Sequence, residues 1–486
     1  MRRATRGALL VAMLACLGAP AQAQDAAADA QLLHSVQRDA PKLQEMTHAL
    51  WAHPELGYLE VESSRRLQDA LRQASFDVQA GVAGMPTAFV ARAGRRGNGP
   101  VIALLAEMDA LPGMSQAATP VREPIPGQDA GQACGHNLFG PAAVVAARAV
   151  KDWLEANGQD GEIRVYGTPA EEGGSGKVYM VKAGLFDDVD IALHWHPSSA
   201  NSARQDGSLA NISGKFRFHG VAAHAAISPD RGRSALDGVE ALDFMANMMR
   251  EHVPDGTRIH YVITNGGDAP NVVPETAEVY YYVRHADPAV VRDVFARLRK
   301  AADGAAAGTG TTVEFEQTGG VYSLLPSDSL GQVLDAALRE VGGVAYDADD
   351  TTFATRLQES LDRPAPLAEA AQVQPYGVDG PGFSSTDVGD VSWVVPTAGI
   401  GTATWVPGTP AHSWQAVAAS GHAIGNKGAL NAARALALGA VALYRSPDVV
   451  EQAKAEFQRR RGDGFRYESM LERTTPPLDY RKAVEH

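Results

Sequence analysis

A cysteine and a histidine separated by one glycine are the first residues of this sequence that could carry chemistry. Gly135 permits a tight turn that brings the side chains of Cys134 and His136 to one side of the chain. A thiolate can bridge two cations, and an imidazole binds zinc, manganese, cobalt or nickel. The pair therefore predicts half of a metal site. A buried apolar cysteine beside a surface histidine would explain the same residues.

Acidic residues and further histidines follow two apolar runs that predict buried strands. Glu171 and Glu172 come just after residues 161–168, and His194 and His196 close the run over residues 190–197. Side chains two residues apart share a face of a strand but stand about 6.6 Å apart, so we expect only one of these histidines to bind a given ion. Alternatively, the two glutamates are a solvated pair that opens a helix.

A third apolar run, over residues 101–106, is nearly continuous, as expected of a central parallel strand buried on both faces. It ends at Glu107 and Asp109, and open α/β sheets place their sites at the carboxyl ends of such strands. The nearby Gly-Gly-Ser-Gly-Lys177 does not match a phosphate-binding loop, because the first glycine of that motif would fall at Glu171.

The elements that must position these residues predict an α/β protein with an insertion. Helical patterns cover residues 28–53, 62–76, 141–156, 420–444 and, as a charged surface helix, 452–473. From residue 208 to about 325 the order becomes strand, helix, strand, strand, helix, strand, which is the ferredoxin-like unit. Catalytic-looking residues resume only afterwards. We therefore predict one domain formed by residues 24–207 and 326–486, and an inserted domain over 208–325.

Composition and charge narrow the class of protein. The chain has 486 residues, 45% hydrophobic and 21% charged, which predicts two or three globular domains. Its formal net charge of -14 argues against nucleic acid or an anionic membrane surface as the main partner.

The N-terminus has the pattern of a secretory signal peptide. Arg2, Arg3 and Arg6 precede an apolar stretch over residues 8–17 that is too short to span a bilayer, and a small-residue cleavage site ends at Ala23. We expect a periplasmic or secreted protein with no membrane segment in its mature form. A twin-arginine signal and a lipobox over residues 13–16 are alternatives with poorer flanking residues.

Export would also determine how many cysteines the mature chain keeps. Cys16 would leave with the signal peptide, so the mature chain would keep only Cys134 and could form no intramolecular disulfide. A lone thiol in an oxidising compartment is a liability unless it is buried or binds a metal, which favours a ligand role for Cys134.

Eight motifs in order, spread over nearly the whole mature chain, resemble one family of metal-dependent amidohydrolases and peptidases. They lie at residues 106–116, 134–137, 167–172, 194–197, 223–225, 271–274, 385–390 and 410–413. The family includes hippurate hydrolase, the plant auxin-amino-acid hydrolases and the bacterial aminobenzoyl-glutamate hydrolases, and the sequence is most similar to the last of these. Gln132 and Ser384 depart from the pattern, since relatives often have His and Gly there.

The resemblance implies a zinc-peptidase-like mixed sheet and an inserted domain that serves as lid and dimerisation unit. It implies two divalent ions per subunit, zinc or manganese, with cobalt or nickel as alternatives. The implied metal ligands are Cys134, His136, Glu172, His194 and His412. Glu171 would be the general base, His224 would stabilise the oxyanion in a partner's site, and Asn271 and Arg284 would hold a substrate carboxylate.

Together these residues predict a metal-dependent hydrolase that cleaves the amide bond of N-acyl or aroyl amino acids or dipeptide-like substrates, such as aminobenzoyl-glutamate. A homodimer is expected, with a heterodimer of paralogous subunits as the alternative. A cysteine hydrolase using Cys134 would leave Glu171, Glu172, His194 and His412 without roles. A non-catalytic exported binding protein conflicts with the complete ligand set.

Overall fold

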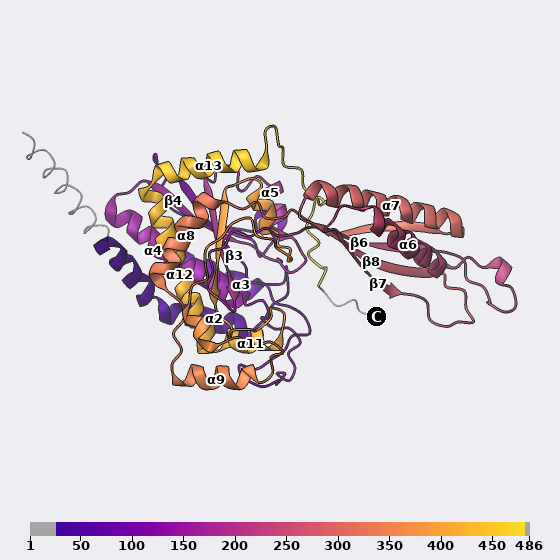
Figure 1. Ribbon diagram of the computed structural model, residues 1–486, viewed down its shortest axis with the longest axis horizontal. Coiled ribbons are helices and arrows are strands. Elements are labelled where there is room, and N and C mark those ends of the chain that lie inside the picture. The colour runs from indigo at the N-terminus through magenta and orange to yellow at the C-terminus, as the bar shows by residue number, and fades with distance from the viewer. Residues whose placement is uncertain (1–25, 482–486) are drawn as a thin grey trace, which may run out of the picture.

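The structure, a computed structural model, describes residues 26–481. It contains a six-stranded mixed sheet flanked by helices and a separate four-stranded antiparallel sheet that carries two helices (Figure 1). The predicted α/β fold with an inserted α+β unit is confirmed. The predicted signal peptide, residues 1–23, lies outside the described residues. None of the helices in residues 26–481 is long and apolar enough to cross a membrane.

The six-stranded sheet of the catalytic domain has the strand order β1-β2-β4-β3-β5-β10. Its strands are β1 Asp77–Ala80, β2 Phe89–Arg95, β3 Val101–Ala106, β4 Gly161–Gly167, β5 Ile191–Ser198 and β10 Thr397–Ala403. Strands β4, β3, β5 and β10 run parallel, whereas β2 is antiparallel to both β1 and β4. Every residue of β3 is buried, as its continuous apolar run predicts.

Helices cover both faces of this sheet. They are α2 Ala40–Ala52, α3 Val61–Gln73, α4 His136–Asn157, α5 Gly176–Lys182, α8 Asp328–Val341, α9 Ala348–Gln358, α10 Val388–Ser392, α11 Trp414–Gly421, α12 Ala423–Arg445 and α13 Pro447–Arg461. Helices α4, α8 and α12 build the largest core on one face, and α5 and α10 contribute to a smaller core on the other.

Two predicted helices differ from the structure. The helix predicted over residues 28–53 is interrupted at Asp39, because Pro41 lies in the first turn of α2 and lacks the N–H that a continuous helix would need. The helix predicted over 452–473 begins earlier and ends at Arg461, where Gly462 has φ 83°.

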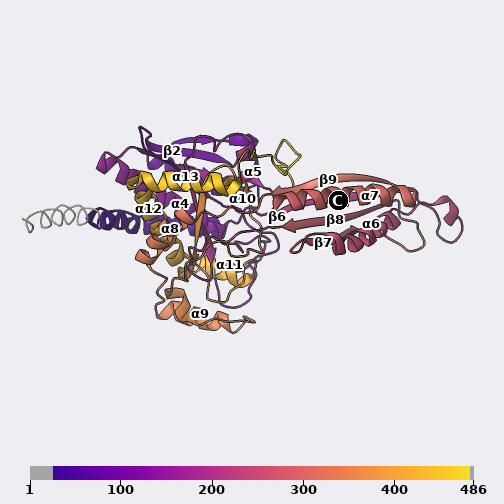
Figure 2. The ribbon, with the colours of Figure 1, turned by 45° about the horizontal axis from the view of Figure 1, so that its top comes forward.

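The second domain extends from the catalytic domain as an elongated arm (Figure 2). It comprises β6 Ala210–His219, α6 Ala235–Met249, β7 Arg258–Asn265, β8 Thr276–His285, α7 Pro288–Thr309 and β9 Thr312–Val321. The strand order is β7-β8-β6-β9, and the sequence of elements matches the predicted ferredoxin-like unit. Strand β7 is an edge strand, and Val262 on it and Phe244 on α6 are more than half exposed.

The C-terminal tail, residues 462–481, runs from α13 past the junction of the two domains (Figure 1). Met470 is buried in the core of the second domain, and the Gln317 side chain of β9 donates to its carbonyl at 2.7 Å. The next residue, Leu471, is buried in the smaller core of the catalytic domain. The tail therefore packs against both domains.

Candidate metal centre and active site

The side chains that the sequence singles out converge at the carboxyl ends of β3, β4 and β5. Among residues 26–481, three groups of side chains hold ligand atoms within 4.8 Å of one another. They are Cys134, His136 and His196; Cys134, Glu172 and His412; and Glu107, His136 and Glu171. Because the groups share Cys134 and His136, they form one continuous set, which we call the ligand cluster.

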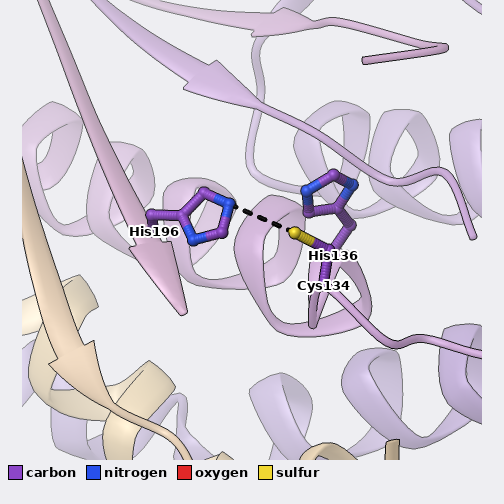
Figure 3. A group of neighbouring side chains, drawn as sticks. All are labelled: Cys134, His136 and His196. Carbon is purple, nitrogen blue, oxygen red and sulfur yellow. Dashed lines mark hydrogen bonds between the residues drawn. The ribbon is translucent and has the colours of Figure 1, made fainter. Parts of the chain in front are cut away.

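The turn before α4 brings Cys134 and His136 into the cluster. Gly135 has φ 73°, and a side chain there would come within 2.8 Å of the Cβ atom of Pro197, so both conformation and space require glycine. Cys134 is buried, and its sulfur lies 3.5 Å from Nε2 of His196 (Figure 3).

The histidine that joins the cluster from β5 is His196, where the sequence resemblance implied His194. Both rings leave the same face of the strand, but His196 lies two residues nearer its end, where the Cys134 turn packs on Pro197. His194 belongs to none of the three groups, and its ring occupies the space beside Gly399 of β10. Burial lowers the pKa of His194 to about 4 and also lowers the pKa of His196, so both rings are neutral near pH 7.

Glu172 and His412 enter the cluster from two further segments. His412 lies beyond β10 in a left-handed backbone conformation with φ 56°, and its N–H donates to the carbonyl of Ala133 at 3.0 Å. Nε2 of His412 is 3.1 Å from Oε1 of Glu172. Asp109 links the segments, since its carboxylate contacts Nδ1 of His136 at 3.0 Å and accepts from the N–H of Glu172 at 2.8 Å.

Buried polar atoms in the cluster lack hydrogen-bond partners. Oε2 of Glu107 and Nε2 of His136 are 3.1 Å apart, yet neither makes a hydrogen bond of acceptable geometry, and Oε1 of Glu172 is likewise unpartnered. Such atoms are rare in folded proteins and are explained when a cation is their partner. One thiol, several imidazoles and several carboxylates suit zinc, manganese or cobalt. The residues present therefore fit divalent metal ions.

A fully buried lysine balances the charge beneath the cluster. Nζ of Lys177 lies 2.6 Å from Glu107 and 2.7 Å from Asp387. Burial opposes a charge on Glu107, but the Lys177 ammonium and, after it, the imidazoles of His136 and His196 together outweigh burial and lower the pKa of Glu107 to about 2. Lys177 thus keeps Glu107 ionised beside His136.

Glu171 is placed by a strained turn after β4. Ala170, just before it, has φ 57°, and its N–H donates to the buried carboxylate of Glu60 at 2.8 Å. Burial, followed by the Glu107 and Glu172 carboxylates, raises the pKa of Glu171 well above its ordinary value. A carboxyl group with a raised pKa is suited to accept and return a proton.

A cavity of about 400 Å³ opens between the two domains beside the cluster. Glu171, Glu172 and His412 line it from the catalytic domain, and Arg284 lines it from β8 of the second domain. Nη1 of Arg284 donates to Oγ of Ser385 at 3.1 Å. This predicted carboxylate-binding residue therefore lies in the cavity of its own chain.

The structure places His224 and Asn271 at the opposite end of the second domain. Strand β6 runs from Asn211, which lines the cavity, to His219, a distance of ~26 Å at ~3.3 Å per residue. His224 lies beyond that far end, is exposed, and forms an isolated bridge with Val272 next to Asn271. Neither predicted residue lines the cavity of its own chain.

Sequence reasoning left the choice between two histidines open and missed two other residues of the site. The choice of His196 over His194 had no sequence signal, because both share one strand face. The role of Lys177 depends on Asp387, which lies 210 residues away. Arg481, in the tail, also lines the cavity and lies outside every recognised motif.

These features define a class of two-domain hydrolases. The α/β domain carries a cluster of histidine, cysteine and carboxylate side chains at the ends of its parallel strands, and an α+β domain is inserted into it. Residues 208–309 match the family model described as a peptidase dimerisation domain. The chain is 40% identical over 453 residues to one of the p-aminobenzoyl-glutamate hydrolase subunits of Escherichia coli, covering 87% of this chain and 94% of that protein. The chain belongs to the M20 peptidase family and is a hydrolase that acts on amide bonds.

Other relatives and solved structures agree with this assignment. Xaa-Arg dipeptidase of Mus musculus is 31% identical over 86% of this chain and 89% of its own length. A dinuclear metal-binding M20 peptidase of Bacillus subtilis has the same fold with a TM-score of 0.57 and 18% identity, over 84% of this chain and 99% of that one. The aminobenzoyl-glutamate utilization protein of Klebsiella pneumoniae has a TM-score of 0.56 and 21% identity, over 82% of this chain and 98% of that one. The family resemblance predicted from the motifs is confirmed.

Proposed function

We propose that this protein hydrolyses the amide bond of N-acyl or N-aroyl amino acids, including aminobenzoyl-glutamate-like compounds, with two divalent metal ions per subunit. The observation that carries the proposal is the ligand cluster, whose three groups are linked through Cys134 and His136. The cluster opens onto a cavity that Arg284 lines from the second domain. The name of the Escherichia coli relative supports the substrate class.

Five side chains would hold the two ions, with zinc or manganese as the expected metals. They are Cys134, His136, Glu172, His196 and His412. Cys134 would supply a soft thiolate ligand, which zinc accepts together with imidazole and carboxylate ligands. When bound, the ions supply positive charge that acidifies the attacking water and polarises the scissile carbonyl.

Glu171 performs the proton transfers in this proposal. Its carboxylate takes a proton from the attacking water and delivers it to the leaving amine nitrogen. The environment that raises the pKa of Glu171 lets it hold that proton between the two steps. Arg284 orients the substrate by its carboxylate, since a guanidinium presents a planar fork of donors.

The alternative of a cysteine hydrolase agrees less well with the environment of Cys134. Burial raises the pKa of the Cys134 thiol, which opposes formation of a free thiolate nucleophile. That alternative also gives no role to the unpartnered Oε1 of Glu172.

We also propose a dimer built through the second domain in a periplasmic or secreted protein. Helix α6 exposes Phe244 and Met248, and β7 exposes Val262 on one face of the sheet and Ile263 on the other, so apolar side chains flank an unpaired strand edge. A heteromer is the alternative, because two Escherichia coli relatives are named as different subunits of p-aminobenzoyl-glutamate hydrolase, and the chain is also 30% identical to the second of them over 256 residues. The compartment rests on the sequence of residues 1–23 alone.

Hydrolysis of a panel of N-acyl amino acids, dipeptides and aminobenzoyl-glutamate by metal-reconstituted protein tests the proposal. Chelation should abolish activity, and zinc, manganese or cobalt should restore it. Glu171→Gln should keep its metal and lower kcat by at least ~10²-fold. Full activity of the metal-free protein, combined with loss on thiol alkylation, would establish the cysteine hydrolase instead. Loss of metal in Glu171→Gln would show that Glu171 is a ligand.

A further inference from the structure

The last described residue of the C-terminal tail, Arg481, reaches the wall of the active-site cavity. Its Nη2 donates to the backbone carbonyl of Glu172 at 2.6 Å, and the neighbouring Tyr480 hydroxyl donates to the same carbonyl at 3.3 Å. The tail thus places a permanent cation beside the segment that carries Glu171 and Glu172.

The Arg481 guanidinium keeps unused hydrogen-bonding capacity. Its Nε is a buried atom with no hydrogen-bond partner, although the guanidinium carbon lies 5.0 Å from the centre of the Tyr480 ring. A charged donor buried without an acceptor is costly, so such a group is expected to meet an anionic ligand.

Arg284, on the second domain, also has a guanidinium with an unpartnered nitrogen, and it lines the same cavity. One of its terminal nitrogens donates to Ser385, its guanidinium carbon lies 5.3 Å from the centre of the Tyr282 ring, and its Nε is buried without a partner. The cavity therefore has two incompletely satisfied guanidinium groups, contributed by different parts of the chain.

Of the carboxylates that line the cavity, two have a basic neighbour, and the third, Glu171, is paired with neither arginine. Asp387 is paired with Lys177, and Glu172 lies against His412. Within residues 26–481, neither Arg284 nor Arg481 forms an ion pair with a carboxylate. A ligand with one carboxylate could satisfy one guanidinium, whereas a ligand with two could satisfy both.

We infer that Arg481 is a specificity-determining residue that binds a second carboxylate of the substrate, while Arg284 binds the first. The inference rests on the proposed hydrolysis of acyl amino acids and narrows it to substrates whose amino-acid part is dicarboxylic. Arginine suits this task because its fork of donors pairs with a carboxylate in a bidentate geometry.

The tail is held firmly enough to position Arg481. Nζ of Lys182 donates to the carbonyl of Arg473 at 2.7 Å, and the Arg473 side chain pairs with Glu316 of β9 at 3.3 Å. The Tyr480 ring packs edge-on against Tyr58, with ring centres 5.6 Å apart. Contacts to both domains fix the approach of Arg481 before any ligand binds, which lowers the entropy cost of binding.

Calorimetric titration of metal-loaded protein with glutamate and with glutamine tests the inference, because these products differ only in the charge of the side-chain terminus. The wild-type protein should bind glutamate at least ~10-fold more tightly than glutamine, the usual scale of a charge-assisted hydrogen bond. Arg481→Gln should weaken glutamate binding ~10- to 100-fold and leave glutamine binding within ~2-fold. Arg481→Lys should restore part of the preference, since it keeps the charge and loses the fork.

Arg473→Gln is the control for loosening of the tail, because it removes one contact of the tail with Glu316, away from the cavity, and leaves Arg481 and its Tyr480 neighbour in place. It should preserve the wild-type preference. In turnover, Arg481→Gln should raise KM for aminobenzoyl-glutamate more than for aminobenzoyl-glutamine, with kcat and bound metal unchanged. Equal weakening of glutamate and glutamine, or loss of metal, would make Arg481 a purely structural support of Glu172.

The binding and turnover measurements separate this inference from the proposed function. A protein that prefers glutamate through Arg481 but hydrolyses no member of the panel would retain the inference and refute the proposed function. A protein that hydrolyses glutamate and glutamine derivatives equally well, with or without Arg481, would retain the function and refute the inference.

Discussion

The sulfur of Cys134 lies 3.5 Å from Nε2 of His196, whereas His194, two residues earlier on the same strand face, packs beside Gly399. The two histidines are therefore not equivalent, although both are half-buried and uncharged near pH 7. We expect His196→Ala to lower metal affinity by more than ~10²-fold, beyond the effect usual for a residue that only supports a ligand. His194→Ala should retain both ions.

Metal content after dialysis against a weak chelator measures this difference, with thermal unfolding to verify that both variants fold. Full metal loading of His196→Ala together with metal loss in His194→Ala would return the ligand role to His194.

The positions of Cys134, His136, Glu171 and Glu172 could be predicted because each follows a buried strand or a glycine turn, and parallel strands bring their carboxyl ends together. The choice between His194 and His196 could not, since strand periodicity gives both the same face. Lys177 and Arg481 were also beyond prediction. Their surroundings are built by residues hundreds of positions away, and local sequence patterns carry no information about such contacts.

Lys177→Met tests the buried charge balance beneath the cluster. The substitution leaves Glu107 and Asp387 buried without their cation, which should lower the free energy of unfolding by about 3–5 kcal/mol. Denaturant unfolding measures the loss. Lys182→Met is the control, because it lies on the same helix and its ammonium donates only to exposed or half-buried carbonyls of the tail. Adding Asp387→Asn to Lys177→Met should recover part of the lost stability, because it removes one of the two unpaired carboxylates. If Lys177→Met and Lys182→Met lower the free energy of unfolding equally, the charge balance is contradicted.

Glu456 gives a stability contribution that depends on pH. It accepts from the N–H groups of Asp328 and Ser329 at the start of α8, at 2.8 and 2.9 Å. Burial opposes its charge, but the hydrogen bonds from Ser329 and Asp328 outweigh burial and lower the pKa of Glu456 to about 2. Because the pKa is lower in the folded state, this contribution is complete above about pH 4.5 and is lost as the pH falls toward 2.

Glu456→Gln should therefore destabilise the protein by about 1–3 kcal/mol at pH 7, with a difference from wild type that shrinks between pH 4.5 and pH 2. Unfolding measured across this range provides the check. A difference that stays constant from pH 6 to pH 3 would show that the charge of Glu456 is not what stabilises α8.

His224 should act in the active site of a partner subunit. It lies beyond the far end of β6, ~26 Å or more from the cavity of its own chain at ~3.3 Å per strand residue. It is exposed, between the apolar side chains of Val221 and Ile227, which are 51% and 80% exposed and suited to contact another subunit. A donor directed at the developing oxyanion is worth ~10² to 10³ in kcat. His224→Ala should therefore remain folded, dimeric and metal-loaded while losing nearly all activity.

Mixing the inactive His224→Ala and Glu171→Gln proteins under conditions that exchange subunits tests action across the interface. In a mixed dimer, one site combines the intact Glu171 of the first chain with the intact His224 of the second, so activity should return to that site. His219→Ala is a control at the neighbouring strand end, where Nε2 of His219 lies 3.6 Å from Glu314 of the same chain, and it should remain active before mixing. If exchange is demonstrated and no activity returns, His224 does not complete a partner's site, and its exposed position would then need another explanation.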